Sequence, residues 1–330
     1  MFMKRLLELV TPVASVLLLM CTVGVTAAGA QTWPTKPVKI IVPAPAGSSL
    51  DVIARALSEK LRTGWKQPVI VENKAGAGGM IGMDVVAKAP ADGHTIGIGF
   101  NGPIAFGPFM YKKMPYSPTS DLTPIVMTTS QPNVLAVTAD NPANTLPEFV
   151  AWVRAQGDKF TYASVGKGSS SHLTMELFRL TVGVAAVHVP YSGSPPAGLS
   201  VAAGDTQALF TVAPALLPLV EGKRVKLIAV TSLQRDELMK HLPTVAESGY
   251  PGFEALAWNG LFTAAATPPE LIDRINADVN AVLNDAGVRD HLNRQGLAIA
   301  GGSAAEFKAF IEKESRKWGE IIETVGIKTE

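Results

Sequence analysis

Short β-branched runs alternate with amphipathic segments along most of the chain. The first run, at 38–42, leads into a Pro/Gly/Ser turn and then an amphipathic segment at 51–61, which predicts a strand, a loop and a helix in that order. The strand signal returns at 69–72 and at 95–99, and a glycine-rich loop and a helical segment lie between these two runs. Because strands alternate with helices, we expect a mostly parallel sheet with helices on both faces.

The pattern changes in the middle of the chain. Two extended runs, at 125–129 and 134–138, are separated by Gln131-Pro132, and we interpret them as a crossing between domains. A second α/β series follows, with helices expected at 146–155, 170–180 and 197–203 and strands at 161–165, 186–189, 207–211 and 225–230. Another extended run at 256–263 precedes helices expected at 268–283, 288–294 and 304–325.

The two series predict an α/β protein of two lobes joined by two crossing strands. Residues 31–130 and 255–330 are expected to form lobe 1, to which the chain returns after lobe 2, residues 131–254. The length of 330 residues agrees with about two domains. A ligand would then bind between the lobes.

The beginning of the chain differs in composition from the rest. Basic residues at 4–5 precede an apolar run at 13–25, and a small-residue stretch ending at Ala30 closes it. This pattern predicts a secretory signal peptide over residues 1–30, cleaved after Ala30. The residue before Cys21 is methionine, where a lipoprotein signal has a small residue, so ordinary cleavage and release into the periplasm are expected. No later stretch approaches the roughly 20 consecutive apolar residues of a membrane helix.

Composition and charge narrow the function classes. Without residues 1–30 the chain has no cysteine, so no disulfide can form, and its basic and acidic side chains are equal in number. Nucleic acids and anionic membranes favour basic excess, so neither is an expected partner. The five histidines are scattered without ligand spacing, and no metal site is indicated. Any preference for an anion must come from a local site.

The first candidate site is the loop at 43–49, between the carboxyl end of a predicted strand and the amino end of a predicted helix. Ligands of α/β sheets bind at such positions, where free backbone N–H groups and the helix dipole favour an anion. Ser48 and Ser49 add hydroxyl donors. The alternative is a tight turn with helix capping, and we prefer capping for Asp51 because its charge would repel a carboxylate.

A second site of the same kind spans 164–172, again strand, flexible loop and helix start. A Gly-Ser-Ser-Ser sequence there can present hydroxyl and N–H groups together, and simple capping is the equally weighted alternative. Gly168 follows Lys167 where a P-loop needs Ser or Thr, and Gly76, Gly78 and Gly82 lack the dinucleotide spacing. No nucleotide and no other cofactor is therefore expected.

Catalysis has only weak support in the sequence. Residue 190 is proline, so the G-x-S-x-G hydrolase elbow is absent around Ser192. Lys167 with Ser169 or Ser192 leaves a periplasmic serine hydrolase or amidase as the alternative function. Tyr191, Ser192 and Asp205 are expected instead to orient or close upon a ligand.

Trp258 lies near the start of the extended run at 256–263. We expect it to pack in the core or in the wall of a site, with its indole N–H hydrogen-bonded.

From about Trp33 to the C-terminus the chain resembles the Bug family, the extracytoplasmic receptors of tripartite tricarboxylate transporters. The matching stretches are 33–37, 42–55, 71–73, 89–93, 121–124, 169–173, 189–193, 242–247 and 258–262. The resemblance implies a type II periplasmic-binding-protein fold whose lobes close like a flytrap on a small carboxylate. It implies a monomeric, non-catalytic receptor that delivers the solute to membrane subunits of a transporter. A sensor for a signalling system would use the same fold.

The resemblance also implies where the ligand binds. In such receptors the loop matching 46–49 and the helix start matching Ser164 and 169–172 hold a carboxylate, and 191–193 lines the opposite wall. Topology adds Asn101 and Phe106 at the solute's distal end. The expected ligand-binding residues are Ala46, Gly47, Ser48, Ser49, Asn101, Ser164, Gly168, Ser169, Ser170, His172, Tyr191, Ser192, Gly193 and Asp205.

Two departures from the family pattern affect the expected ligand. The family commonly has Gly-Gly where this chain has Gly47-Ser48, and often has lysine where this chain has Ser192. The missing cation at that wall weakens the case for a second carboxylate on the ligand.

Overall fold

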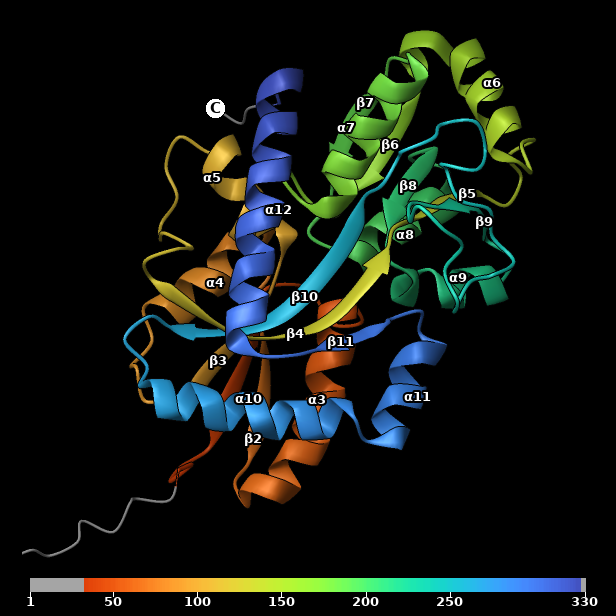
Figure 1. Ribbon diagram of the computed structural model, residues 1–330. Coiled ribbons are helices and arrows are strands. Elements are labelled where there is room, and N and C mark those ends of the chain that lie inside the picture. Colours follow the sequence, from red (N-terminus) through yellow and green to blue (C-terminus); the bar gives the residue numbers. More distant parts are fainter. Residues whose placement is uncertain (1–32, 328–330) are drawn as a thin grey trace, which may run out of the picture. The chain divides into compact units, whose positions relative to one another are not determined.

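The computed structural model describes residues 33–327. The predicted signal peptide, its cleavage after Ala30 and Cys21 lie outside this part of the chain. The described residues from Lys36 onward are grouped by their contacts into one unit, which contains the helices and strands of Figure 1.

The first sheet is six-stranded, in the order β11-β4-β10-β3-β1-β2. Its strands are β1 (Val38–Val42), β2 (Val69–Asn73), β3 (Thr95–Phe100), β4 (Leu122–Pro132), β10 (Leu256–Ala264) and β11 (Ile299–Gly301). β1 pairs in parallel with β2 and β3, whereas β10 is antiparallel to both β3 and β4. The long strands β4 and β10 run side by side in Figure 1.

The second sheet is five-stranded, in the order β7-β6-β8-β5-β9. Its strands are β5 (Val134–Thr138), β6 (Thr161–Ser164), β7 (Val187–Pro190), β8 (Ala208–Thr211) and β9 (Val225–Val230). β6 is parallel to β7 and β8, and β5 is antiparallel to β8 and β9. Only Asn133 separates β4 from β5, so the chain passes directly from one sheet to the other.

Both sheets are therefore mixed, and the expectation of mostly parallel sheets was wrong in this respect. The reason lies in the crossing strands. β4, β5 and β10 run antiparallel to their neighbours in the sheets, while the strands that alternate with helices stay parallel. Periodicity identifies a strand but carries no information on its direction.

Most predicted helices are present with small changes at their ends. The α-helices are α3 (Ser49–Trp65), α4 (Met80–Ala87), α5 (Gly107–Met110), α6 (Leu146–Gln156), α7 (Ser170–Val182), α8 (Ser194–Ala203), α9 (Leu217–Glu221), α10 (Pro269–Leu283), α11 (Ala286–Arg294) and α12 (Ala304–Val325). Short turns of other helix types are η1 (Ala77–Gly79), η2 (Gly102–Phe106), η3 (Gly157–Lys159) and η4 (Ala213–Ala215). The prediction missed α5, η2 and α9, because they are short and each contains proline near its start.

Trp258 packs in the core, with 0% of its surface exposed. Its ring meets those of Phe307 and Phe310 edge to face, at 5.5 and 5.8 Å between centroids. The expectation that its indole N–H is hydrogen-bonded was wrong, since within the described residues Nε1 has no partner. Neighbouring aromatic carbons offer no acceptor. Gly260 makes room for this packing, because a Cβ there would lie 2.2 Å from Phe307.

Candidate functional site

A cavity lies where strands of both sheets end and three helices begin. The strand ends contribute Pro43, Ala44, Phe100, Asn101, Val165, Thr211 and Val212. The starts of α3, α7 and α8 contribute Ser48, Ser49, Leu50, Ser170, Ser171, Ser192, Gly193 and Ser194. The remaining lining residues are Gly78, Gly79, Asn133, Ala257 and Asn259.

Helix α3 begins at a capped turn on one side of the cavity. Ser48 is the N-cap, and its hydroxyl accepts a hydrogen bond from the Asp51 backbone N–H at 3.3 Å. In return, the Asp51 carboxylate accepts from the Gly47 N–H at 3.0 Å. The two bonds hold the loop against the helix start. Asp51 therefore has the capping role that was preferred for it from the sequence.

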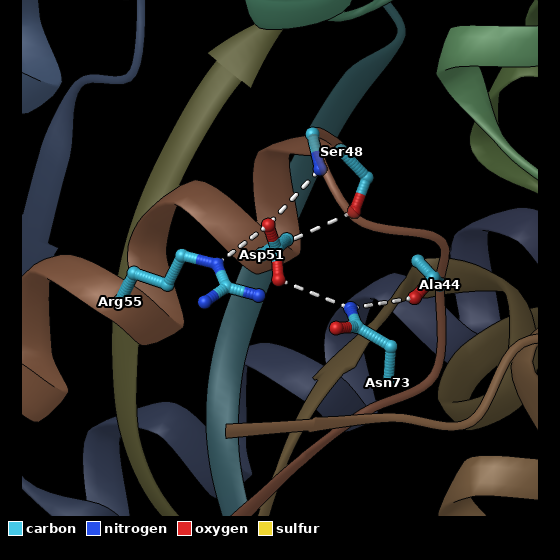
Figure 2. Close-up of polar contacts among 6 residues, drawn as sticks. Ala44, Ser48, Asp51, Arg55 and Asn73 are labelled. Atoms are coloured by element: carbon cyan, nitrogen blue, oxygen red, sulfur yellow. Dashed lines mark hydrogen bonds and ion pairs between the residues drawn. The ribbon is translucent and has the colours of Figure 1, made fainter. Parts of the chain in front are cut away.

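The Asp51 carboxylate also binds two side chains (Figure 2). Arg55 Nε donates to it at 2.9 Å, and Asn73 Nδ2 donates to it and to the carbonyl of Ala44, both at 3.0 Å. Burial acts to raise the pKa of Asp51, but these hydrogen bonds and the charge of Arg55 outweigh it, and the pKa lies below its ordinary value. The charge of Asp51 is therefore neutralised by Arg55, and the hydrogen bonds of Asn73 connect this carboxylate to β2 and to the first loop.

Helix α7 begins on another side of the cavity in a similar way. Ser169 is its N-cap: the hydroxyl accepts from the His172 N–H at 3.2 Å and donates to the Gly166 carbonyl at 2.7 Å. Ser170 and Ser171 follow and line the cavity. Ser170 Oγ accepts from Asn133 Nδ2 at 2.9 Å, and Ser171 donates to the Phe210 carbonyl.

Ser49 differs from the other serines at these helix starts. Its residue surface is only 3% exposed, it lines the cavity, and among the described residues its hydroxyl has no hydrogen-bond partner. A buried hydroxyl that faces a cavity without a partner is available to a ligand.

Three rings stack beneath the loop at 165–168. His188 lies 4.1 Å from His172 and 4.9 Å from Tyr162, measured between ring centroids. Ser164 Oγ lies 2.6 Å from His188 Nε2, and His172 Nδ1 accepts from the Gly168 N–H at 3.2 Å. Burial lowers the pKa of His172 to about 3 and that of His188 to about 4. Both rings are neutral at ordinary pH. Their hydrogen bonds with Gly168 and Ser164 hold the two ends of the loop.

Loops from the two sheets meet around the cavity. Tyr111 Oη donates to the Lys167 carbonyl at 2.9 Å. A Cβ on Gly78 would lie 2.7 Å from that same carbonyl oxygen, and one on Gly193 would lie 2.4 Å from Pro45. Backbone atoms at glycines therefore make the close approach.

The structure brings together part of the predicted site. Of the expected residues, those that line the cavity are Ser48, Ser49, Asn101, Ser170, Ser192 and Gly193. Those outside the lining are Ala46, Gly47, Ser164, Gly168, Ser169, His172, Tyr191 and Asp205.

Most of the predicted residues outside the lining support the loops. Ser169 and His172 organise the start of α7, as described above. Asp205 is exposed and follows the C-terminal end of α8, whose first residues line the cavity, so the expected ligand contact is not supported by its position. Phe106 packs against Trp318 at 5.0 Å, and Phe100 lines the cavity instead.

Sequence reasoning missed several lining residues. Gly78 and Gly79 belong to the glycine-rich loop, which was weighed only as a nucleotide motif. Asn133 stands alone between the crossing strands, and its amide N–H groups donate to Ser170 and Thr174 at 2.9 and 3.0 Å. A lone polar residue between two apolar strands was the available signal.

Two α/β sheets joined by crossing strands, with a cavity at the helix starts, define the class of two-lobed periplasmic binding proteins. In the part of the chain that is described, no helix combines the length and apolarity needed to cross a bilayer.

The family follows from sequence. The profile of the tripartite tricarboxylate transporter family receptor (TctC) matches residues 53–327, and the chain belongs to this family of solute-binding receptors. A UPF0065 protein of Pseudomonas sp., from the tcbD-tcbE intergenic region, is 36% identical over 94% of this chain and 92% of its own length. BugT of Bordetella pertussis is 33% identical over 93% and 95%. The predicted resemblance to Bug receptors is confirmed.

Solved structures agree. An R. palustris protein solved with adipate has a TM-score of 0.87 and 33% identity, covering 89% of this chain and 98% of its own. MatC from Rhodopseudomonas palustris, solved with bound malate, has a TM-score of 0.83 and 28% identity, covering 88% and 100%. The predicted fold and the role of a solute-binding receptor are confirmed by these relatives.

Proposed function

We propose that this receptor captures a small carboxylate in the described cavity, within the periplasm, and passes it unchanged to the membrane subunits of a transporter. The observation that carries the proposal is the convergence of three helix starts, α3, α7 and α8, on one cavity. Each start presents backbone N–H groups and the positive end of a helix dipole to an anion. Ser49 adds an unpartnered hydroxyl.

Movement of two lobes would close the site. We place lobe 1 at 31–130 and 255–330 and lobe 2 at 131–254, so that the chain crosses between them near the end of β4 and again just before β10. A carboxylate that contacts helix starts on both sides binds best when the lobes meet, so binding shifts the population toward the closed form. The structures of relatives with adipate and malate support a carboxylate as the solute. A monomer suffices for this mechanism.

A serine hydrolase has less support. Ser169 has no exposed surface, and its hydroxyl proton is directed to the Gly166 carbonyl. A nucleophile needs access to substrate and a base that accepts its proton.

The test is a thermal-shift screen of the purified receptor against a panel of small carboxylates. A ligand at 100 times its dissociation constant adds about 2.7 kcal/mol of stability, which gives a clear upward shift. Mass spectrometry should then return the acid intact. Absence of a shift with every acid would contradict the carboxylate proposal, and consumption of the acid would favour the hydrolase.

A further inference from the structure

The cavity lining contains no charged side chain among the described residues. The nearby ions are already paired with each other: Asp51 binds Arg55 at 2.9 Å, and Glu176 binds Arg179 at 2.7 Å. Lys167 is exposed and does not line the cavity. Positive potential in the cavity therefore comes from the helix starts and from hydroxyl and N–H dipoles.

That potential is enough to offset one negative charge but not two. Each helix start carries roughly half an elementary positive charge, so three starts supply about 1.5. The helices are long enough to contribute, with 17, 13 and 10 residues in α3, α7 and α8. Ser49, nearly buried and unpartnered, is a further donor for the same anion. A second buried carboxylate would lack a compensating charge, and uncompensated burial of an ion is costly.

The remaining residues of the cavity lining suit the uncharged part of a solute. Leu50, Phe100, Val165, Val212 and Ala257 present apolar surface to the cavity. Apolar walls with a few polar groups bind the corresponding uncharged part of a solute. We propose that this receptor selects acids with one carboxylate and an uncharged, largely apolar remainder over dicarboxylates and tricarboxylates. The inference rests on the proposed function, because it requires that the cavity holds a carboxylate.

Matched pairs of acids test the selectivity by isothermal titration calorimetry at pH 7.5. Hexanoate and adipate share a six-carbon chain, and benzoate and terephthalate share a ring, so each pair differs in one carboxylate. We expect the monoacid of at least one pair to bind about tenfold more tightly than its diacid. Equal or tighter binding of the diacids would overturn the inference and leave the proposed function intact. Binding of none of the four acids would overturn both.

A charge-adding variant tests the same inference from the protein side. Ser192 lines the cavity and is exposed, so a lysine there can face a ligand without being buried. Ser192→Lys should raise the affinity ratio of adipate to hexanoate, relative to Ser192→Met, by about tenfold, because one charge-assisted hydrogen bond becomes available. Ser192→Met supplies similar length without charge. The same ratio in both variants would show that charge in the cavity does not set the preference.

Discussion

At the scale of single residues, the cavity depends on where each run of serines enters its helix. Ser48 and Ser169 are N-caps whose hydroxyls accept a backbone N–H of the first helical turn, and the next residues, Ser49 and Ser170, line the cavity, as Ser48 also does. The sequence shows a cluster of serines before a helix but does not show where the helix begins to within one residue. Candidate loops could therefore be predicted, while the residue that contacts a ligand could not.

Asp51 is the residue on which the first loop most depends. Asp51→Asn should lower the free energy of unfolding by about 1–3 kcal/mol at pH 7, because Arg55 loses its ion partner and the Gly47 N–H loses a charged acceptor. Since the pKa of Asp51 is lowered in the folded state, this contribution is present at neutral pH and is lost as pH falls below the ordinary aspartate value.

Urea denaturation at pH 7 and at pH 3.5 measures the effect of Asp51→Asn. Asp290→Asn is the control, since Asp290 pairs with Arg294 on an exposed helix surface and should change stability by less than about 0.5 kcal/mol. A difference between wild type and Asp51→Asn that does not shrink in acid would argue against the lowered pKa.

At the scale of elements, periodicity located most strands and helices because each buries one face. Periodicity did not predict the direction of the strands or the short proline-containing helical turns, because neither leaves a periodic pattern in a few residues. The sequence analysis also did not predict the stack of Tyr162, His172 and His188. Its members come from β6, α7 and β7, which lie apart in sequence and meet only in the folded sheet.

Because His172 is buried in this stack, we expect the free energy of unfolding to fall in mild acid. The pKa of His172 is about 3 in the folded state because of burial, while an unfolded histidine has a pKa near 6.5. The unfolded chain binds a proton first, so stability is complete above about pH 6.5 and falls as pH decreases toward the folded pKa. His172 alone should account for about 2 kcal/mol lost by pH 5.

Urea titrations at pH 7.5 and pH 5 compare wild type with His172→Gln, which keeps an acceptor for the Gly168 N–H. The variant should lose less stability over this interval than the wild type. His291→Gln, on an exposed surface of α11, serves as the matched control and should follow the wild type. Equal pH dependence in all three proteins would refute a role for His172.

At the scale of the whole molecule, two amide side chains near the junction of β4 and β5 have opposite environments. Asn133 is bonded to both Ser170 and Thr174, which tie it to α7. Gln131 is 1% exposed, and neither atom of its amide has a hydrogen-bond partner within residues 33–327. A buried amide without partners destabilises the fold by about 1–3 kcal/mol.

Replacement of Gln131 should therefore stabilise the protein. Gln131→Met keeps the length of the side chain, removes the polar atoms, and should raise the free energy of unfolding by about 1 kcal/mol. Asn133→Leu, two residues away, should lower it by about 1–3 kcal/mol, because Ser170 and Thr174 lose their donor. Chemical denaturation of both variants checks the contrast, and a destabilised Gln131→Met would contradict it.

The glycine contacts around the cavity have a consequence for selection by size. A Cβ on Gly78 would meet the main-chain carbonyl of Lys167, and a Cβ on Gly193 would meet the ring of Pro45, and neither of these groups can rotate away. If the lobes close as proposed, rigid groups would therefore fix the distance between the two rims in the closed form. We would then expect a solute that is slightly too large to hold the rims apart and to lose affinity abruptly.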